Sequence, residues 1–141
     1  MQKRFHRKKE DEVEKADKFG DLLLVDHIVF GKDEEAGYEG ETSAVFVADD
    51  ATDLRDIIPV ADRTADEAEI VVKNCVEGEP IGAVFSDLSK ELKAIAKRNK
   101  WVHRRATPHR PEAHGKLEIT VRYTKEATRC NLLQSRLQHK W

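Results

Sequence analysis

The feature that most constrains the fold is the apolar run at residues 22–30, which reads LLLVDHIVF. Its length and β-branched content predict a strand, and its apolar residues occupy both alternating faces. A strand that buries both faces must lie inside a sheet that is covered on each side. We therefore predict a layered α/β fold with this strand near the centre of a mixed sheet.

Other segments extend this pattern along the chain. Further strands are predicted at residues 42–48, 54–60, 82–87 and 101–106. A helix is predicted from Thr64, because Thr64 and Glu67 have the form of a capping box, and a second helix at residues 88–99. The order predicts three antiparallel strands, then helix, strand, helix, strand and a last element.

The last element carries two competing patterns. Residues 117–124 alternate apolar and polar side chains, which is typical of a strand. Over a longer window, apolar residues recur at steps of three and four, which is typical of a helix; these are Ile119, Tyr123, Ala127, Cys130, Leu133 and Leu137. We favour a helix because its pattern spans nearly twenty residues, whereas the alternation spans only eight.

The length of 141 residues suits one domain. Residues 1–18 are charged and nearly devoid of apolar side chains, so they predict a disordered arm before a core domain at 19–141. No apolar run approaches the roughly 20 residues that span a bilayer, and no signal peptide follows Met1. We expect an intracellular protein with no membrane segment, in which Cys75 and Cys130 are reduced thiols.

The net charge of −2 hides a strong asymmetry. Residues 32–79 contain 15 acidic and 4 basic side chains, whereas residues 93–116 contain 8 basic and 1 acidic side chain. A solvated helix face next to a basic loop is one interpretation. The concentration of positive charge around residues 107–118 favours a second one, a binding surface for nucleic acid.

Two acids occupy positions that need an explanation. Asp26 lies inside the apolar run, where a carboxylate must pair with a cation, accept hydrogen bonds or bind a metal. Asp87 follows a strand and precedes a helix, so it is a candidate helix N-cap. The ends of adjacent strands in an α/β sheet are also where functional sites gather. Both acids therefore have a structural and a functional interpretation.

A third acid follows a stiff basic loop. Residues 107–118 read TPHRPEAHGKLE, in which Pro108 and Pro111 restrict the backbone and Arg110 offers donors to phosphate. Glu118 ends the segment. Three carboxylates on separate elements can hold two Mg²⁺ or Mn²⁺ ions for phosphoryl transfer. The sequence contains no GxxxxGK[ST], GxGxxG or GxSxG motif, so the corresponding chemistries find no support.

Three segments together resemble the catalytic core of retroviral and LTR-retrotransposon integrases, the DDE enzymes of the ribonuclease H-like superfamily. Residues 24–27 (LVDH) resemble the first-strand aspartate motif of that family. Residues 85–92 (FSDLSKEL) are similar to its Ser-Asp-Asn-Gly-x-Glu-Phe block, and residues 107–118 to its Thr-Pro-Tyr-x-Pro-Gln-x-Asn-Gly-x-x-Glu block.

This resemblance implies a ribonuclease H-like five-stranded mixed sheet with flanking helices, and a metal-binding catalytic triad of Asp26, Asp87 and Glu118. It implies Mg²⁺ or Mn²⁺ as the cofactor, and retroelement ends and target DNA as partners of a homo-oligomer in the nucleus or a retroelement particle. The residues expected to contact the nucleic acid are Arg104, Arg105, His109, Arg110, His114 and Lys116.

Several residues depart from the family pattern. Leu88 stands where Asn is usual, Glu112 where Gln is usual and His114 where Asn or Ser is common. The resemblance thus implies a fragment or a degenerate copy of an integrase, with activity impaired by this divergence. A catalytically silent domain that binds nucleic acid or partner subunits is one alternative, and a ribonuclease H-like nuclease acting on RNA is another.

Overall fold

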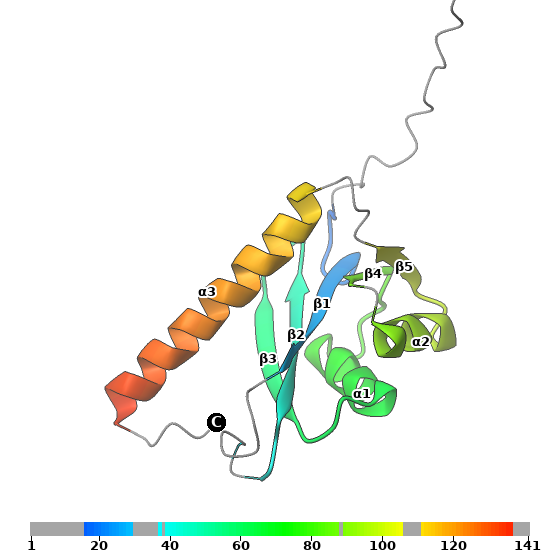
Figure 1. The fold of residues 1–141 in the computed structure, drawn as a ribbon. Coiled ribbons are helices and arrows are strands. Elements are labelled where there is room, and N and C mark those ends of the chain that lie inside the picture. Colours follow the sequence, from blue (N-terminus) through cyan, green and yellow to red (C-terminus); the bar gives the residue numbers. More distant parts are fainter. Residues whose placement is uncertain (1–15, 30–36, 38, 88, 106–110, 137–141) are drawn as a thin grey trace, which may run out of the picture.

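A computed structural model describes residues 16–29, 37, 39–87, 89–105 and 111–136. Its elements follow the chain in the predicted order (Figure 1). They are β1 (Leu22–Val29), β2 (Ser43–Asp49), β3 (Arg55–Val60), α1 (Ala65–Cys75), β4 (Ala83–Ser86), α2 (Lys90–Arg98), β5 (Val102–Arg105) and α3 (Pro111–Ser135). The predicted strands and helices are therefore confirmed, with ends that differ by a few residues in all but the last helix. That helix begins at Pro111, so the prediction of a loop over residues 107–118 is wrong from Pro111 onward.

The five strands form one mixed sheet in the order β3-β2-β1-β4-β5. The first three strands pair antiparallel as a meander, and β1–β4 and β4–β5 pair parallel. The central place of β1 confirms the expectation from its two apolar faces. It also places two functional candidates, Asp26 on β1 and Asp87 after β4, on neighbouring strands.

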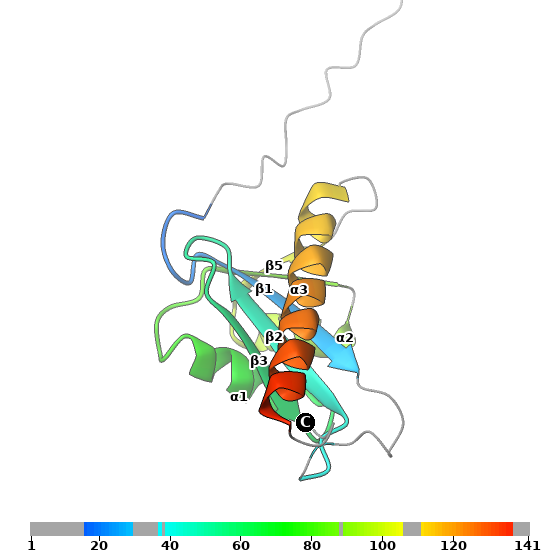
Figure 2. The same cartoon turned by 90° about the vertical axis from the view of Figure 1, so that its left-hand side faces the viewer.

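Both faces of the sheet are covered, as Figures 1 and 2 show, with α1 and α2 on one side and α3 on the other. Leu23 and Val25 of β1 pack in the core cluster that contains α1 and α2 residues. Leu22 and Leu24 pack in the second cluster, together with Leu117 of α3. Alternate residues of one strand thus supply two separate cores, as a period of two requires.

The capping box at the start of α1 is confirmed only in part. The Thr64 hydroxyl accepts a hydrogen bond from the Glu67 N–H at 3.3 Å, as a capping residue should. The Glu67 carboxylate accepts instead from the N–H of Asp62 at 3.0 Å, two residues before the cap. Glu67 therefore ties the incoming loop to the helix.

The last element is a helix, as favoured, but the apolar residues that indicated it are largely exposed. Ile119, Tyr123 and Leu133 are 48%, 55% and 64% exposed, whereas Leu117 and Val121 are buried against the sheet. Polar residues can face the sheet because their hydroxyls are satisfied within the helix: Thr124 donates to the Thr120 carbonyl and Thr128 to the Thr124 carbonyl, each at 2.9 Å. The apolar side chains of Ile119, Tyr123 and Leu133 therefore point away from the sheet, toward solvent.

A buried carboxylate, Asp49, fixes the start of β1. It is only 2% exposed, and it accepts hydrogen bonds from Gly20 N–H at 2.9 Å and from the N–H and hydroxyl of Thr52 at 2.8 Å each. Gly20 has a φ of +85°, and an added Cβ would lie 2.5 Å from the Pro80 carbonyl oxygen. Only glycine therefore suits this position.

The predicted arm at residues 1–18 lies outside the described residues as far as Lys15, and Ala16 packs in the second core cluster. Within the part of the chain that the structure describes, no helix is long and apolar enough to cross a membrane.

Candidate functional site

Asp26 lies on β1 among residues that alternate between the two cores. Leu24 and Ile28, which share its strand face, pack in the cluster with α3. The side chain of Asp26 is therefore on the α3 side of the sheet, and it is half-buried. Its Oδ1 accepts a hydrogen bond from the N–H of His27 at 2.9 Å. This backbone hydrogen bond satisfies one oxygen of the carboxylate within an otherwise apolar strand.

Asp87 comes directly after β4, and its carboxylate is exposed. The residue that caps α2 is Ser89, whose hydroxyl accepts from the N–H of Leu92 at 3.3 Å. The interpretation of Asp87 as the N-cap is therefore wrong. Asp87 Oδ1 instead accepts a hydrogen bond from the backbone N–H of Ser89, the capping residue, at 2.9 Å.

Glu118 lies on α3 and is exposed, next to the buried Leu117 that anchors this helix to the sheet. The helical geometry places Glu118 about 100° around the axis from Leu117. Its side chain therefore leaves the helix at the border between the sheet-facing side and solvent.

The sheet register relates two of the three acids. The parallel register pairs Leu24 with Phe85, and Asp26 and Asp87 each lie two residues beyond this pair. Asp26 faces the side on which α3 packs. Among the described residues, however, no group of three or more His, Cys, Asp or Glu side chains is close enough to hold a metal ion. The carboxylates of Asp26, Asp87 and Glu118 therefore do not form a preassembled metal site in this structure.

The chemistry of the donor set suits a hard divalent cation, because all three candidate ligands are carboxylates. Asp87 and Glu118 are exposed, so either side chain can change rotamer without disturbing core packing. Asp26 is the fixed member, since its strand is held in the centre of the sheet.

His27 occupies the opposite face of β1, as the alternation of the strand predicts, and this separates it from Asp26. Both ring nitrogens are buried and have no hydrogen-bond partner within the described part of the chain. Burial lowers the pKa of His27 and the nearby Arg63 adds to this effect, while the carboxylates of Glu91 and Asp87 partly oppose it. The imidazole is therefore held in its neutral form more strongly than in water.

A hydrogen bond that the sequence did not predict joins β4 to β5 beside Asp87. The hydroxyl of Ser86 lies 2.8 Å from Nε2 of His103, and it donates to the carbonyl oxygen of Asp87 at 3.0 Å. Ser86 is fully buried. The register pairs Ser86 with Arg105, and His103 lies two residues earlier on β5, so its side chain is on the same face and diagonally across from Ser86. A residue spacing of 17 in the chain gives no sequence signal for this contact.

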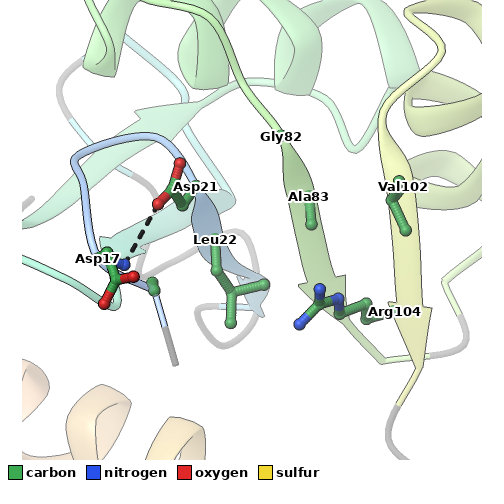
Figure 3. A pocket seen from close by; sticks show the side chains of 8 residues that line it. Asp17, Asp21, Leu22, Gly82, Ala83, Val102 and Arg104 are labelled. Atoms are coloured by element: carbon green, nitrogen blue, oxygen red, sulfur yellow. Dashed lines mark hydrogen bonds between the residues drawn. The ribbon is translucent and has the colours of Figure 1, made fainter. Parts of the chain in front are cut away.

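Of the basic residues expected to contact nucleic acid, Arg104 is the one with a described side chain. It extends from β5 toward β4 in a pocket of about 710 Å³ that Leu22, Ala83 and Val102 also line (Figure 3). Two acids, Asp17 and Asp21, share this pocket. His109 and Arg110 lie outside the described residues, as do the side chains of Arg105, His114 and Lys116.

Comparison with known proteins bears on the fold. No known protein family matches the sequence, and no curated protein does. Among solved structures, the chain is similar to the catalytic core domain of BIV integrase, with a TM-score of 0.58 and 14% sequence identity over 84% of this chain and 74% of that one. Its five-stranded mixed sheet with flanking helices therefore has the fold of that catalytic core domain.

Proposed function

We propose that the chain is a metal-dependent polynucleotidyl transferase core that acts on DNA phosphodiesters. The observation that carries this proposal is the placement of three carboxylates on an integrase-like fold. Asp26 lies on the central strand, Asp87 follows the adjacent parallel strand, and Glu118 lies on the helix that covers the face of Asp26. Acids on three separate elements are what a shared metal site requires.

In this proposal Asp26, Asp87 and Glu118 bind Mg²⁺ or Mn²⁺ through their carboxylate oxygens. When bound, the cations would activate water or a DNA 3′-hydroxyl and stabilise the leaving oxygen. The exposed side chains of Asp87 and Glu118 would turn toward Asp26, which is half-buried. Metal binding would draw the three ligands together.

The basic segment at residues 93–116 would position the DNA backbone. Its 8 basic side chains against 1 acidic provide a local field that attracts phosphate. The proposed contacts are Arg104, Arg105, His109, Arg110, His114 and Lys116. The resemblance of residues 107–118 to the integrase loop supports this assignment, and retroelement ends and target DNA are the partners that it suggests.

The test is cleavage and strand transfer on a labelled DNA duplex, with Mg²⁺ or Mn²⁺ and with EDTA as the metal-free control. We expect metal-dependent products that fall by at least 100-fold in Asp87→Asn, roughly the loss expected for removing a key electrostatic group. Asp62→Asn, at an exposed acid before α1, is the matched control and should keep full activity. Activity that survives Asp87→Asn would contradict the proposal.

A catalytically silent domain that binds nucleic acid is the second candidate. One specific observation favours it: the described residues contain no three-ligand group, and Asp26 and Asp87 each accept a hydrogen bond from a neighbouring backbone N–H at 2.9 Å. Salt-sensitive DNA binding without metal-dependent turnover would support this candidate. A third candidate, an RNA-directed nuclease, would prefer an RNA–DNA hybrid over duplex DNA in the same assay.

A further inference from the structure

The backbone carbonyl of Asp87 lies just beyond the point where the pairing of β1 with β4 ends. The last pair in this register is Leu24 with Phe85. If the ladder continued with the same alternation of bonds, the N–H of His27 would donate to the Asp87 carbonyl. That N–H donates instead to the carboxylate of Asp26 at 2.9 Å. The Asp87 carbonyl therefore depends on a donor from outside the β1–β4 ladder.

The side chain of Ser86 supplies this donor. Its hydroxyl donates to the Asp87 carbonyl oxygen at 3.0 Å, and the same hydroxyl oxygen lies 2.8 Å from Nε2 of His103. Because a hydroxyl has only one proton, the imidazole is the donor in the second contact. A proton from Nε2 that occupies a lone pair of the Ser86 oxygen also limits the directions in which the hydroxyl can point. His103 thus holds the hydroxyl in its orientation toward Asp87.

The surroundings of Ser86 make this arrangement rigid. Ser86 is 0% exposed, so bulk water cannot replace either of its hydrogen-bond partners. Ser86 is the last residue of β4 and His103 lies on β5, so both members of the contact belong to paired strands of the sheet. Groups on strands hold their positions more precisely than groups on loops. The sheet therefore fixes the donor that reaches the Asp87 carbonyl.

The carboxylate of Asp87 is held more loosely than its carbonyl. The side chain is exposed, and its Oδ1 accepts a hydrogen bond from the N–H of Ser89 at 2.9 Å. The backbone of Asp87 is thus tied to the sheet through Ser86, whereas its side chain can turn about the Cα–Cβ bond. A carboxylate that turns on a fixed backbone has fewer positions available than one on a moving backbone. This arrangement suits a ligand that must meet a cation at one place.

We propose that His103 is a positioning residue for Asp87 and acts through the Ser86 hydroxyl. The inference rests on the proposed function, in which Asp87 is one of three metal ligands. Hydrogen bonds to the groups behind a metal ligand orient that ligand, and their loss typically lowers metal affinity or activity by about 10–100-fold. His103 itself is not a metal ligand in this proposal, because its contact is with Ser86 and not with a carboxylate of the site.

The carbonyl carbon of Asp87 reports this positioning in the metal-free chain. Loss of a hydrogen bond moves a carbonyl carbon signal upfield, so in ¹³C,¹⁵N-labelled protein we expect an upfield shift in His103→Phe, which has no donor. Ser86→Ala removes the hydroxyl and defines the shift for complete loss of the bond. His103→Gln retains a side-chain N–H and should restore a signal close to that of the wild type. An Asp87 carbonyl signal that His103→Phe leaves unchanged would overturn the proposal.

Mn²⁺ binding tests whether the positioning serves the proposed site. In His103→Phe the Mn²⁺ concentration that half-broadens the amide signals of Asp26 and Asp87 should rise by about tenfold or more, and His103→Gln should return it to within about twofold of the wild type. Asp49→Ala, which removes a buried carboxylate near the start of β1, is the matched control. It should destabilise the chain and leave this concentration unchanged. An equal rise in Asp49→Ala would overturn the proposal, because the effect would then follow from stability alone.

Failure of this proposal can be distinguished from failure of the proposed function. A wild-type chain with no Mn²⁺ broadening at the three acids contradicts the proposed function, and the metal-free carbonyl signal of Asp87 still decides whether His103 positions it. If the wild type binds Mn²⁺ at all three acids and His103→Phe binds it equally well, the positioning role is overturned and the proposed function stands. Circular dichroism verifies that each variant is folded. Ser86→Ala, which removes a single oxygen atom, takes the place of His103→Phe in both measurements if the larger change prevents folding.

Discussion

The hydroxyl of Ser86 lies 2.8 Å from Nε2 of His103 and 3.0 Å from the carbonyl oxygen of Asp87. A hydroxyl has one proton, and a carbonyl can only accept it, so the hydrogen bond to Asp87 leaves the hydroxyl as an acceptor toward His103. Nε2 of His103 must therefore carry a proton. This pair of bonds ties the end of β4 to β5 immediately before the proposed ligand Asp87.

Ser86 and His103 should therefore be energetically coupled. We expect Ser86→Ala to lower the free energy of unfolding by about 1–2 kcal/mol, because the imidazole loses a buried partner. The double variant Ser86→Ala/His103→Phe should cost less than the sum of the single changes by about 0.5 kcal/mol or more. Urea unfolding of all four proteins measures this coupling. Additive effects would show that the two side chains act independently.

Asp49 should be a structural acid and not a catalytic one. Its carboxylate is 2% exposed and accepts three hydrogen bonds, so Asp49→Ala should lower the free energy of unfolding by roughly 2–3 kcal/mol. Asp62→Ala, at an exposed acid, should change it by less than about 0.5 kcal/mol. Thermal or urea unfolding distinguishes the two. Equal stability of both variants would show that the Asp49 carboxylate does not stabilise the start of β1.

His27 should tolerate an apolar replacement. Its two ring nitrogens are buried without a partner among the described residues, and an unsatisfied buried polar group costs about 1–3 kcal/mol. We expect His27→Leu to raise the free energy of unfolding by about 1 kcal/mol, since leucine has no polar atom to bury. His27→Asn, which keeps polarity and loses volume, should lower it. If leucine proved as destabilising as asparagine, the imidazole would have a stabilising partner.

Cys75 should react slowly with alkylating agents until strongly alkaline pH. Burial raises the pKa of its thiol from 9.0 to about 11, and the Asp56 carboxylate adds to the shift. Only the thiolate is nucleophilic, so in a Cys130→Ser background the alkylation rate should keep rising between pH 9 and pH 11. The unfolded chain in urea should reach half of its maximal rate near pH 9 and serves as the control. A folded-state rate that is also half-maximal near pH 9 would contradict the raised pKa.

The folded state holds the Cys75 proton through this same window, whereas the unfolded state has lost it. Stability from this group is therefore present below pH 9 and is lost as the pH rises toward 11. The alkylation experiment must therefore include circular dichroism at the highest pH used, to verify that the chain is still folded there.

The order of elements could be predicted because each short apolar run forms its own strand or helix. The central place of β1 followed in the same way from its two apolar faces. The buried side of α3 could not be predicted from apolar spacing, because Thr124 and Thr128 satisfy their own hydroxyls and pack toward the sheet. Contacts such as Ser86–His103 depend on the register of two strands far apart in the sequence. The sequence of either strand alone does not determine how the two strands are aligned.

The central claim is that Asp26, Asp87 and Glu118 share one metal site. Paramagnetic Mn²⁺ titrated into ¹⁵N-labelled protein tests it most directly, because Mn²⁺ broadens the amide signals of nearby residues. We predict that signals beside all three acids broaden together at low Mn²⁺, and that Asp87→Asn weakens the broadening at each of them. If broadening instead begins across the acidic residues 49–79 and Asp87→Asn leaves it unchanged, the shared site is contradicted.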